Sequence, residues 1–191
     1  LKAHLFFEEF IQMFDAPSLT EVEGVILTAL HWIGEAQDDY STESAFLKYW
    51  TAIECFFSKD KSDITDKVTT GPAVLSCASN VQFVPLTEIK DYRRRLAALY
   101  NIRSQITHRG LKDCVSATDL ADACCAATRC VTVAMELRAV GTQDLAQFQR
   151  RWFEWRMEFR GPLGERVLWF TDAWAGVVRR CGEIKDRWSR R

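Results

Sequence analysis

The chain has 191 residues, of which 48% are hydrophobic and 27% are charged, and its formal net charge is −1. This composition excludes a disordered chain and is sufficient for one globular core. The near-zero net charge excludes a general electrostatic attraction to nucleic acid. No signal peptide or transmembrane span is visible after Leu1, so we expect a cytoplasmic protein without a membrane partner, or a domain cut from a longer protein.

The first predicted helix begins at a capping motif. The letters SLTE, Ser18 to Glu21, match a capping box. Apolar residues then recur at helical spacing, at Val25, Ile26, Ala29, Leu30 and Ile33. A second helix is predicted over residues 43–57, where one apolar stripe is formed by Phe46, Trp50, Ile53 and Phe57.

The middle of the chain contains several helix breaks. The charged residues 58–66 end the second helix, and a shorter helix is predicted from Ile64 until Gly71 and Pro72 kink or end it. Residues 79–86 are expected to be irregular, with a short extended piece. Thr87 is then expected to cap a long helix that runs to about residue 109, with Gly110 in the left-handed closing position.

The rest of the chain also has helical patterns. A helix over residues 115–140 is predicted to begin at Ser116 and Asp119 and to close near Gly141. Two amphipathic segments follow, at residues 144–160 and 163–180. No segment alternates like a strand, so an all-α bundle is predicted. We expect residues 1–141 to form the main helical domain and residues 142–191 an extension packed on it.

The seven cysteines and three histidines show no metal-binding spacing, and no CxxC pair occurs. We therefore predict free thiols in a reducing compartment, with no disulfide framework, no metal site and no cofactor. Cys124 and Cys125 are adjacent in an alanine-rich segment and are interpreted as small buried residues.

Arg103 interrupts the apolar face of the helix that precedes Gly110. The apolar positions on that face are Ile89, Tyr92, Leu96, Leu99 and Ile106. A guanidinium taken out of water needs a partner, and Glu54 beside the aromatic stripe is the predicted one. His108 is turned by about 140° from Arg103, toward the polar side shared with Asn101 and Gln105. A register-fixing ion pair and a histidine favoured by the helix dipole would also explain these residues.

The letters RSQITH, residues 103–108, read R-x4-H, and with their surroundings the chain resembles the HEPN superfamily, specifically its Apea-like branch. The similarity covers about residues 45–137. KYWTAIECFF resembles the family's aromatic helix with an embedded Glu, and DYRRRLAALYNIRSQITHRG resembles its motif helix. The resemblance implies a HEPN-like helical bundle with additional C-terminal helices, and a homodimer in which two motifs form a metal-independent endoribonuclease site.

The resemblance also implies roles for single residues. His108 would act as general acid or base, Arg103 would stabilise the phosphate, and Glu54 would orient Arg103. Asn101, Ser104 and Gln105 would support the site. Attack by the 2′-OH of RNA would give a 2′,3′-cyclic phosphate, and the setting would be that of a toxin or anti-phage defence effector.

One departure from the family concerns control. Some HEPN toxins carry a modified Tyr two residues after the motif His, whereas this chain has Gly110 there, so control by that route is not expected. The expected partners are RNA, a second copy of the chain, and other domains of a longer parent protein or an antitoxin. The alternatives are a catalytically silent HEPN module that dimerises or binds RNA within a larger protein, and an unrelated helical regulatory domain.

Charge and tryptophan are concentrated toward the C-terminus. Residues 150–191 carry 11 Lys and Arg against 6 Asp and Glu, and five of the seven tryptophans lie there. Basic charge with aromatic stacking is one way to hold single-stranded RNA, although such aromatics also pack in cores. The candidate RNA contacts are Arg109, Arg150, Arg151, Trp152 and Arg156.

Overall fold

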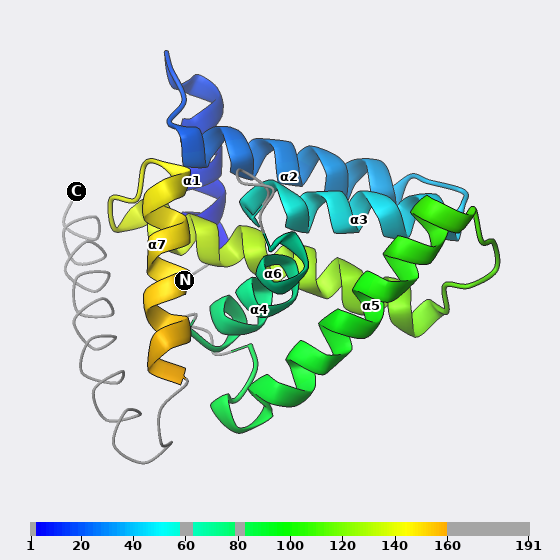
Figure 1. Cartoon of the computed structure of the whole chain (residues 1–191). Helices are drawn as coiled ribbons and strands as arrows, with labels where there is room; N and C mark the ends of the chain where they lie inside the picture. Colours follow the sequence, from blue (N-terminus) through cyan, green and yellow to red (C-terminus); the bar gives the residue numbers. More distant parts are fainter. Residues whose placement is uncertain (1–2, 58–62, 79–82, 160–191) are drawn as a thin grey trace.

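The computed structural model describes residues 3–57, 63–78 and 83–159. Within these ranges the chain forms seven α-helices, one short 3₁₀ helix and no strand, which confirms the all-α prediction (Figure 1). The elements are α1 (Ala3–Asp15), α2 (Glu21–Gln37), α3 (Thr42–Phe57), α4 (Ile64–Ala78), η1 (Leu86–Glu88), α5 (Ile89–Arg109), α6 (Ala117–Ala139) and α7 (Leu145–Phe159).

The helices are arranged around α3. Helices α2, α3 and α6 pack on one another and run in roughly the same line in Figure 1, while α5 crosses them obliquely and α7 stands across one end. Helix α4 packs on α3, α5, α6 and α7. This arrangement leaves the C-terminal end of α5 far from α7.

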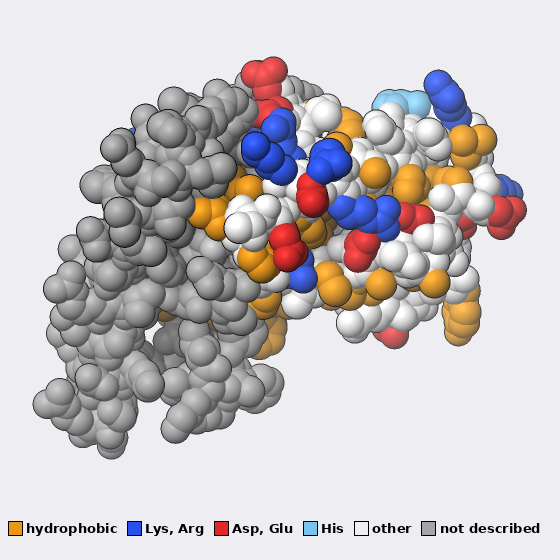
Figure 2. Space-filling view, turned by 90° about the horizontal axis from the view of Figure 1, so that it is seen from below, with side chains coloured by type: hydrophobic (Ala, Val, Ile, Leu, Met, Phe, Trp, Pro, Cys, Tyr) orange, Lys and Arg blue, Asp and Glu red, His pale blue; other side chains and the backbone are white. Residues whose placement is uncertain are grey.

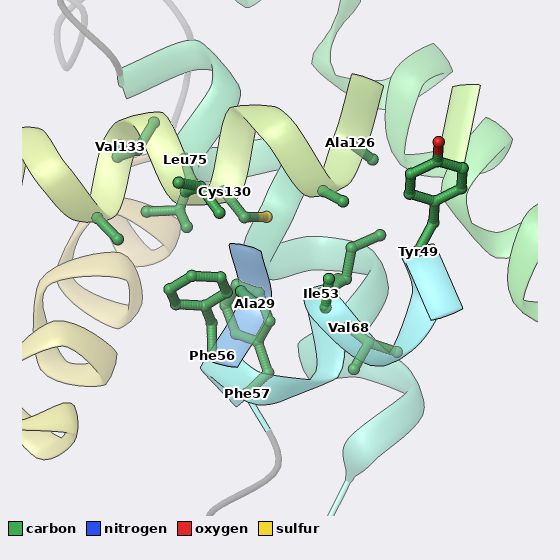
Figure 3. Close-up of a cluster of buried hydrophobic side chains, with 14 of the residues drawn as sticks. Ala29, Tyr49, Ile53, Phe56, Phe57, Val68, Leu75, Ala126, Cys130 and Val133 are labelled. Carbon is green, nitrogen blue, oxygen red and sulfur yellow. The ribbon is translucent and has the colours of Figure 1, made fainter. Parts of the chain in front are cut away.

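The core is aromatic around α3. The predicted stripe of Phe46, Trp50, Ile53 and Phe57 is fully buried, which confirms that interpretation. Phe148 of α7 packs against Phe56 and Phe57, with ring centroids 5.5 and 6.2 Å away. Figure 3 shows Phe56 and Phe57 in the same cluster as Leu75 of α4 and Cys130 and Val133 of α6. Residues of α7 therefore belong to the same core as the central helices.

Two helix beginnings use capping boxes. Helix α6 begins as predicted: the Ser116 hydroxyl accepts a hydrogen bond from the Asp119 N–H, and the Asp119 carboxylate accepts one from the Ser116 N–H. The box at α2 was predicted two residues too early. Its members are Thr20 and Glu23, because Thr20 has the extended backbone that the capping residue requires.

The predicted helix ends at Gly110 and Gly141 are confirmed. Gly110 has φ 62° and donates a hydrogen bond of 3.0 Å to the Ile106 carbonyl. Gly141 has φ 95°, and its N–H bonds to the Arg138 carbonyl while the next N–H bonds to the Leu137 carbonyl. These two bonds are the Schellman arrangement, which satisfies carbonyls that a helix end would leave free.

Two other predicted boundaries are wrong. Helix α4 continues through Gly71 and Pro72 to Ala78, because packing on every side of residues 68–78 outweighs the backbone hydrogen bond that a proline removes. Thr87 does not cap α5. It lies inside η1, and α5 continues from that turn with no side-chain cap at Glu88.

The cysteines differ in part from the sequence interpretation. The six in the described ranges are free thiols, but Cys124 is only half-buried and Cys125 is exposed, so their interpretation as buried residues is wrong. Cys124 packs against the edge of the core, whereas Cys125 lies on the side of α6 that faces away from it. Among the described residues, no helix is long and apolar enough to cross a bilayer.

The close approach of α3 and α4 makes Gly71 sensitive to substitution. A Cβ atom at Gly71 would lie 2.7 Å from Phe57 Cζ and closer still to another carbon of that buried ring. Gly71→Ala should therefore lower the free energy of unfolding by about 1 to 3 kcal/mol. Gly24→Ala is the matched control, because nothing lies within 4 Å of that position in α2 and alanine favours the helix. Urea denaturation measures both, and equal stability of the two variants would contradict this close packing.

Candidate functional site

The predicted ion pair between α5 and α3 is present. The Arg103 Nη2 atom lies 3.1 Å from Glu54 Oε1 and 3.2 Å from Oε2. The two side chains keep 25% and 16% of their surface exposed, so the pair lies at the edge of the core rather than within it. Glu54 therefore fixes the guanidinium while one side of the pair still faces solvent.

Only one nitrogen of Arg103 is used by Glu54. Its Nε and Nη1 atoms make no hydrogen bond to any residue that the structure describes. A guanidinium carries five N–H donors in a planar fork, so most of its donors remain available. A guanidinium that is fixed in place and partly exposed is well suited to bind an oxyanion such as a phosphate group.

Aromatic packing places this ion pair. One turn before Arg103, Tyr100 lies against Trp50 of α3, with ring centroids 5.9 Å apart. Trp50 is fully buried, as are Leu96 and Leu99 on the same side of α5. The contact between Tyr100 and Trp50 fixes how α5 lies on α3. It therefore places Arg103 of α5 opposite Glu54 of α3.

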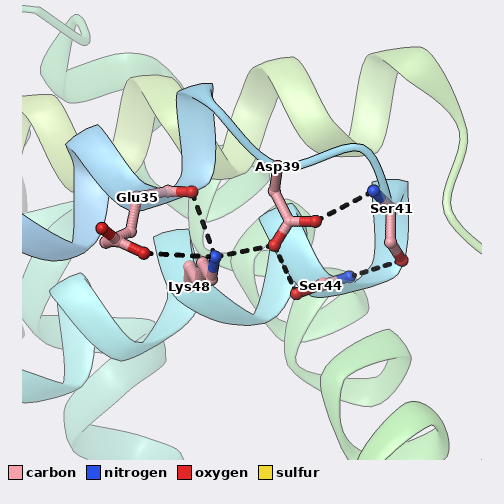
Figure 4. A network of polar contacts seen from close by, with 5 residues as sticks. All are labelled: Glu35, Asp39, Ser41, Ser44 and Lys48. Carbon is pink, nitrogen blue, oxygen red and sulfur yellow. Dashed lines mark hydrogen bonds and ion pairs between the residues drawn. The ribbon is translucent and has the colours of Figure 1, made fainter.

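A second polar network holds the other end of α3 (Figure 4). Lys48 Nζ lies 2.7 Å from Asp39 Oδ2 and donates a hydrogen bond of 3.1 Å to the Glu35 carbonyl of α2. Asp39 also accepts hydrogen bonds from Ser41 and Ser44. Hydrogen bonds from Lys48 and the serines hold the pKa of Asp39 well below its usual range. The network joins the end of α2 to α3, the helix that carries Glu54.

His108 lies in the last turn of α5 and is exposed. Asn101 is also exposed, and Ser104 and Gln105 are half-buried on the same helix. In the described part of the chain, no hydrogen bond joins His108 to Arg103, and the two residues are five positions apart, about 7.5 Å along the helix axis. One chain therefore supplies a held cation and a separate, exposed imidazole.

The other predicted RNA contacts do not form one surface. Arg109, Arg150 and Arg151 are exposed, and Arg151 is 3.8 Å from Glu154. The side chains of Trp152 and Arg156 lie outside the described part of the structure. Figure 1 places α7 and the C-terminal end of α5 at opposite ends of the molecule, so Arg109 is separated from the arginines of α7.

The arginines at the start of α5 are neutralised by carboxylates. Arg93 pairs with Asp66 at 3.2 Å, Arg94 pairs with Asp91, and Arg95 pairs with acidic residues of α6, Asp119 at 2.7 Å and Asp122 at 2.6 Å. Figure 2 accordingly shows acidic and basic side chains interspersed on the described part of the surface. The run of three arginines in the sequence is therefore not a free basic patch.

These pairings were not predicted from the sequence. Burial disfavours the charged form of Asp119, but hydrogen bonds from Ser116 and Arg95 together lower its pKa. Asp119 thus caps α6 and pairs with α5 at the same time. The sequence around Asp119 indicates its capping role. It does not indicate the ion pair, because Arg95 is distant in the chain.

The comparisons with known proteins return no relatives. No family model matches the chain, and neither a curated protein nor a solved structure is significantly similar to it. Among the residues that the structure describes, no group of three or more His, Cys, Asp or Glu side chains is arranged to hold a metal ion. The site is therefore defined by its own geometry and by the R-x4-H pattern.

The two motif residues should differ in their effect on stability. Arg103→Ala would leave Glu54 without its partner in a mostly covered site, which should lower the free energy of unfolding by about 1 to 3 kcal/mol. His108→Ala removes an exposed side chain and should change it by no more than about 0.5 kcal/mol.

Arg94→Ala is the matched control for the loss of an arginine, because its pair with Asp91 is 80% and 70% exposed. Denaturant melts of the three variants test the order. Equal stability of Arg103→Ala and Arg94→Ala would show that the pair with Glu54 contributes nothing to the fold.

Proposed function

We propose that this chain is a metal-independent endoribonuclease of HEPN type, which cuts RNA through attack by the substrate's own 2′-OH. The observation that carries the proposal is the state of Arg103. Glu54 holds its guanidinium through one nitrogen, no other described residue uses its remaining donors, and an exposed His108 lies on the same helix.

The proposed chemistry needs only a proton acceptor, a proton donor and a cation. A histidine accepts the proton of the 2′-OH as its oxygen attacks the adjacent phosphorus, and the bond from phosphorus to the 5′-oxygen breaks. A second histidine protonates that 5′-oxygen. Arg103 stabilises the negative charge that develops on the phosphoryl oxygens. Imidazole suits both proton transfers because it exchanges protons near neutral pH, and a fixed cation stabilises the transition state more than the ground state.

A second copy of the chain would supply the second histidine. His108 is the histidine of the motif, and Asn101 and Gln105 lie toward the same side of α5. A two-fold axis beside this polar face would bring the same patch from each chain together. Two copies of His108 and two of Arg103 would then surround one phosphate.

The biological setting follows from the resemblance alone. It is that of a toxin or anti-phage defence effector, with an antitoxin or further domains of a longer protein as partners and with the cytoplasm as its compartment. The alternative function is a catalytically silent HEPN module. The pair of Glu54 with Arg103 is also compatible with that alternative, because a pair made only to set helix register would have the same geometry.

Cleavage assays separate the two functions. The full chain should cut RNA in the presence of EDTA and leave 2′,3′-cyclic phosphate and 5′-hydroxyl ends, because the nucleophile belongs to the substrate. His108→Ala should lower the rate of RNA cleavage by at least about a hundredfold, which is the usual contribution of a general acid or base. Mass spectrometry identifies the ends, and RNA methylated at the 2′-oxygen of the scissile nucleotide should resist cutting.

His31→Ala is the control for this variant, because that histidine is also exposed but belongs to α2 and not to the motif helix. Activity that disappears in EDTA, returns with magnesium and leaves 5′-phosphate ends would disprove the mechanism. Full activity of His108→Ala would disprove the residue assignment.

The composite site also predicts a dimer. Light scattering should give twice the chain mass of 22.0 kDa, and mixing inactive His108→Ala chains into the wild type should lower its activity more than simple dilution does. The second effect arises because mixed dimers hold only one histidine. A strict monomer that still cuts RNA would contradict the shared site.

A further inference from the structure

The cations of the described chain differ in whether a carboxylate neutralises them. Arg93, Arg94, Arg95, Arg103 and Arg138 each form an ion pair. Arg109 and Lys112 form none with the described residues, although both are exposed. These two residues lie within four positions of His108, on either side of Gly110. Within the described residues, the end of α5 that carries His108 therefore has two exposed cations without an ion pair.

The helix dipole explains only part of this arrangement. The carbonyl end of a helix carries a partial negative charge, so a basic residue in the last turn, such as Arg109, is favoured for structural reasons alone. That effect does not extend past the last turn. Lys112 lies beyond the left-handed Gly110 and next to Asp113, which itself has φ 56°. Its position is set by the turn and not by the helix.

The same dipole creates a requirement at this site. An anionic substrate that approaches the C-terminal end of α5 is repelled by the partial negative charge there. RNA places further phosphates on both sides of the one that reacts, and Arg103 can stabilise only one. Additional cations beside His108 would remove this repulsion. Arg109 and Lys112 lie beside it in the chain, and no carboxylate within the described residues neutralises them.

Other free cations lie elsewhere. Lys90 is at the opposite end of α5, about 27 Å from His108 along the helix axis. Arg150 is on α7, and Arg129 is stacked on the rings of Phe83 and Tyr92 at 5.7 and 5.2 Å. Asp113 is the acidic neighbour in the turn, but it makes no ion pair with Lys112. The pair of free cations beside His108 is therefore a local feature of this turn.

We propose that Arg109 and Lys112 bind the RNA phosphates that flank the scissile one, and so position single-stranded RNA across the end of α5. This inference rests on the proposed ribonuclease function for the identity of the ligand. It adds an RNA-binding role for Lys112. It also places the RNA contact of Arg109 at the C-terminal end of α5, beside His108, and not on a surface shared with α7. Both residues act on substrate binding and neither takes part in proton transfer.

The test measures binding without cleavage. The full chain with His108→Ala is titrated with a short fluorescent single-stranded RNA over a series of salt concentrations. Each phosphate contact contributes about 0.7 to the slope of log K against log salt for a single strand. Arg109→Gln with Lys112→Gln should therefore weaken binding and make the slope shallower by about 1.4. Single-stranded DNA should show the same change, because contacts to phosphate do not read the 2′-OH.

The matched control removes the same charge from the far end of the same helix. Lys90→Gln with Arg94→Gln should leave the slope and the affinity unchanged, and circular dichroism melts confirm that all variants are folded. An unchanged slope in the Arg109 and Lys112 variant, or equal effects of the two double variants, would overturn the proposal. A chain that binds no RNA would overturn it as well.

The outcome is separable from that of the ribonuclease proposal. If binding depends on Arg109 and Lys112 but the wild type does not cut RNA, the basic surface stands and the catalytic function fails. If the wild type cuts RNA and the double variant has an unchanged KM and salt slope, the catalytic function stands and this inference fails. In an active enzyme, the double variant should raise KM and leave kcat nearly unchanged.

Discussion

The burial of α3 constrains the rest of the structure. Its aromatic residues Phe46, Trp50, Phe56 and Phe57 are fully enclosed, and helices α2, α4, α5, α6 and α7 all contact it. A helix enclosed to this degree can keep polar residues only where another element offers a partner. Lys48 and Glu54 are two such residues. Lys48 is bound by Asp39 at the turn before the helix, and Glu54 is bound by Arg103 from α5.

This constraint links packing to the candidate site. The contact of Trp50 with Tyr100 sets where α5 crosses α3, and the next turn of each helix then brings Glu54 and Arg103 together. Further along α5 the helix leaves the core, and His108 is exposed. One helix thus has three paired arginines near its beginning, an arginine bound by Glu54 near its end and an exposed basic terminus.

The wrong sequence predictions share a physical origin. Pro72 was expected to kink or end a helix, and the end is the part that is wrong, because residues 68–78 are all buried and their packing carries α4 through the proline to Ala78. Thr87 looked like a cap, but the 3₁₀ turn that precedes α5 places it inside helical backbone instead. Cys125 was assigned to the core from its alanine-rich surroundings, although it lies on the exposed side of α6. In each case the local sequence pattern did not reveal which residues from other parts of the chain pack against the position.

The sequence alone determined α2 to α7 and most of their ends, because helical periodicity, capping boxes and glycines at left-handed positions act over a few residues. Helix α1 was not predicted. It also indicated that Arg103 needs a carboxylate, since a guanidinium on an apolar face is costly without one. Tertiary structure alone decided which donors Glu54 uses and which remain free on Arg103. It alone also decided that Asp66, Asp119 and Asp122 pair with arginines at the start of α5, while Arg109 and Lys112 form no ion pair with the residues that the structure describes. Ion pairs between distant segments depend on how helices cross, and crossing is set by the packing of side chains from several elements at once.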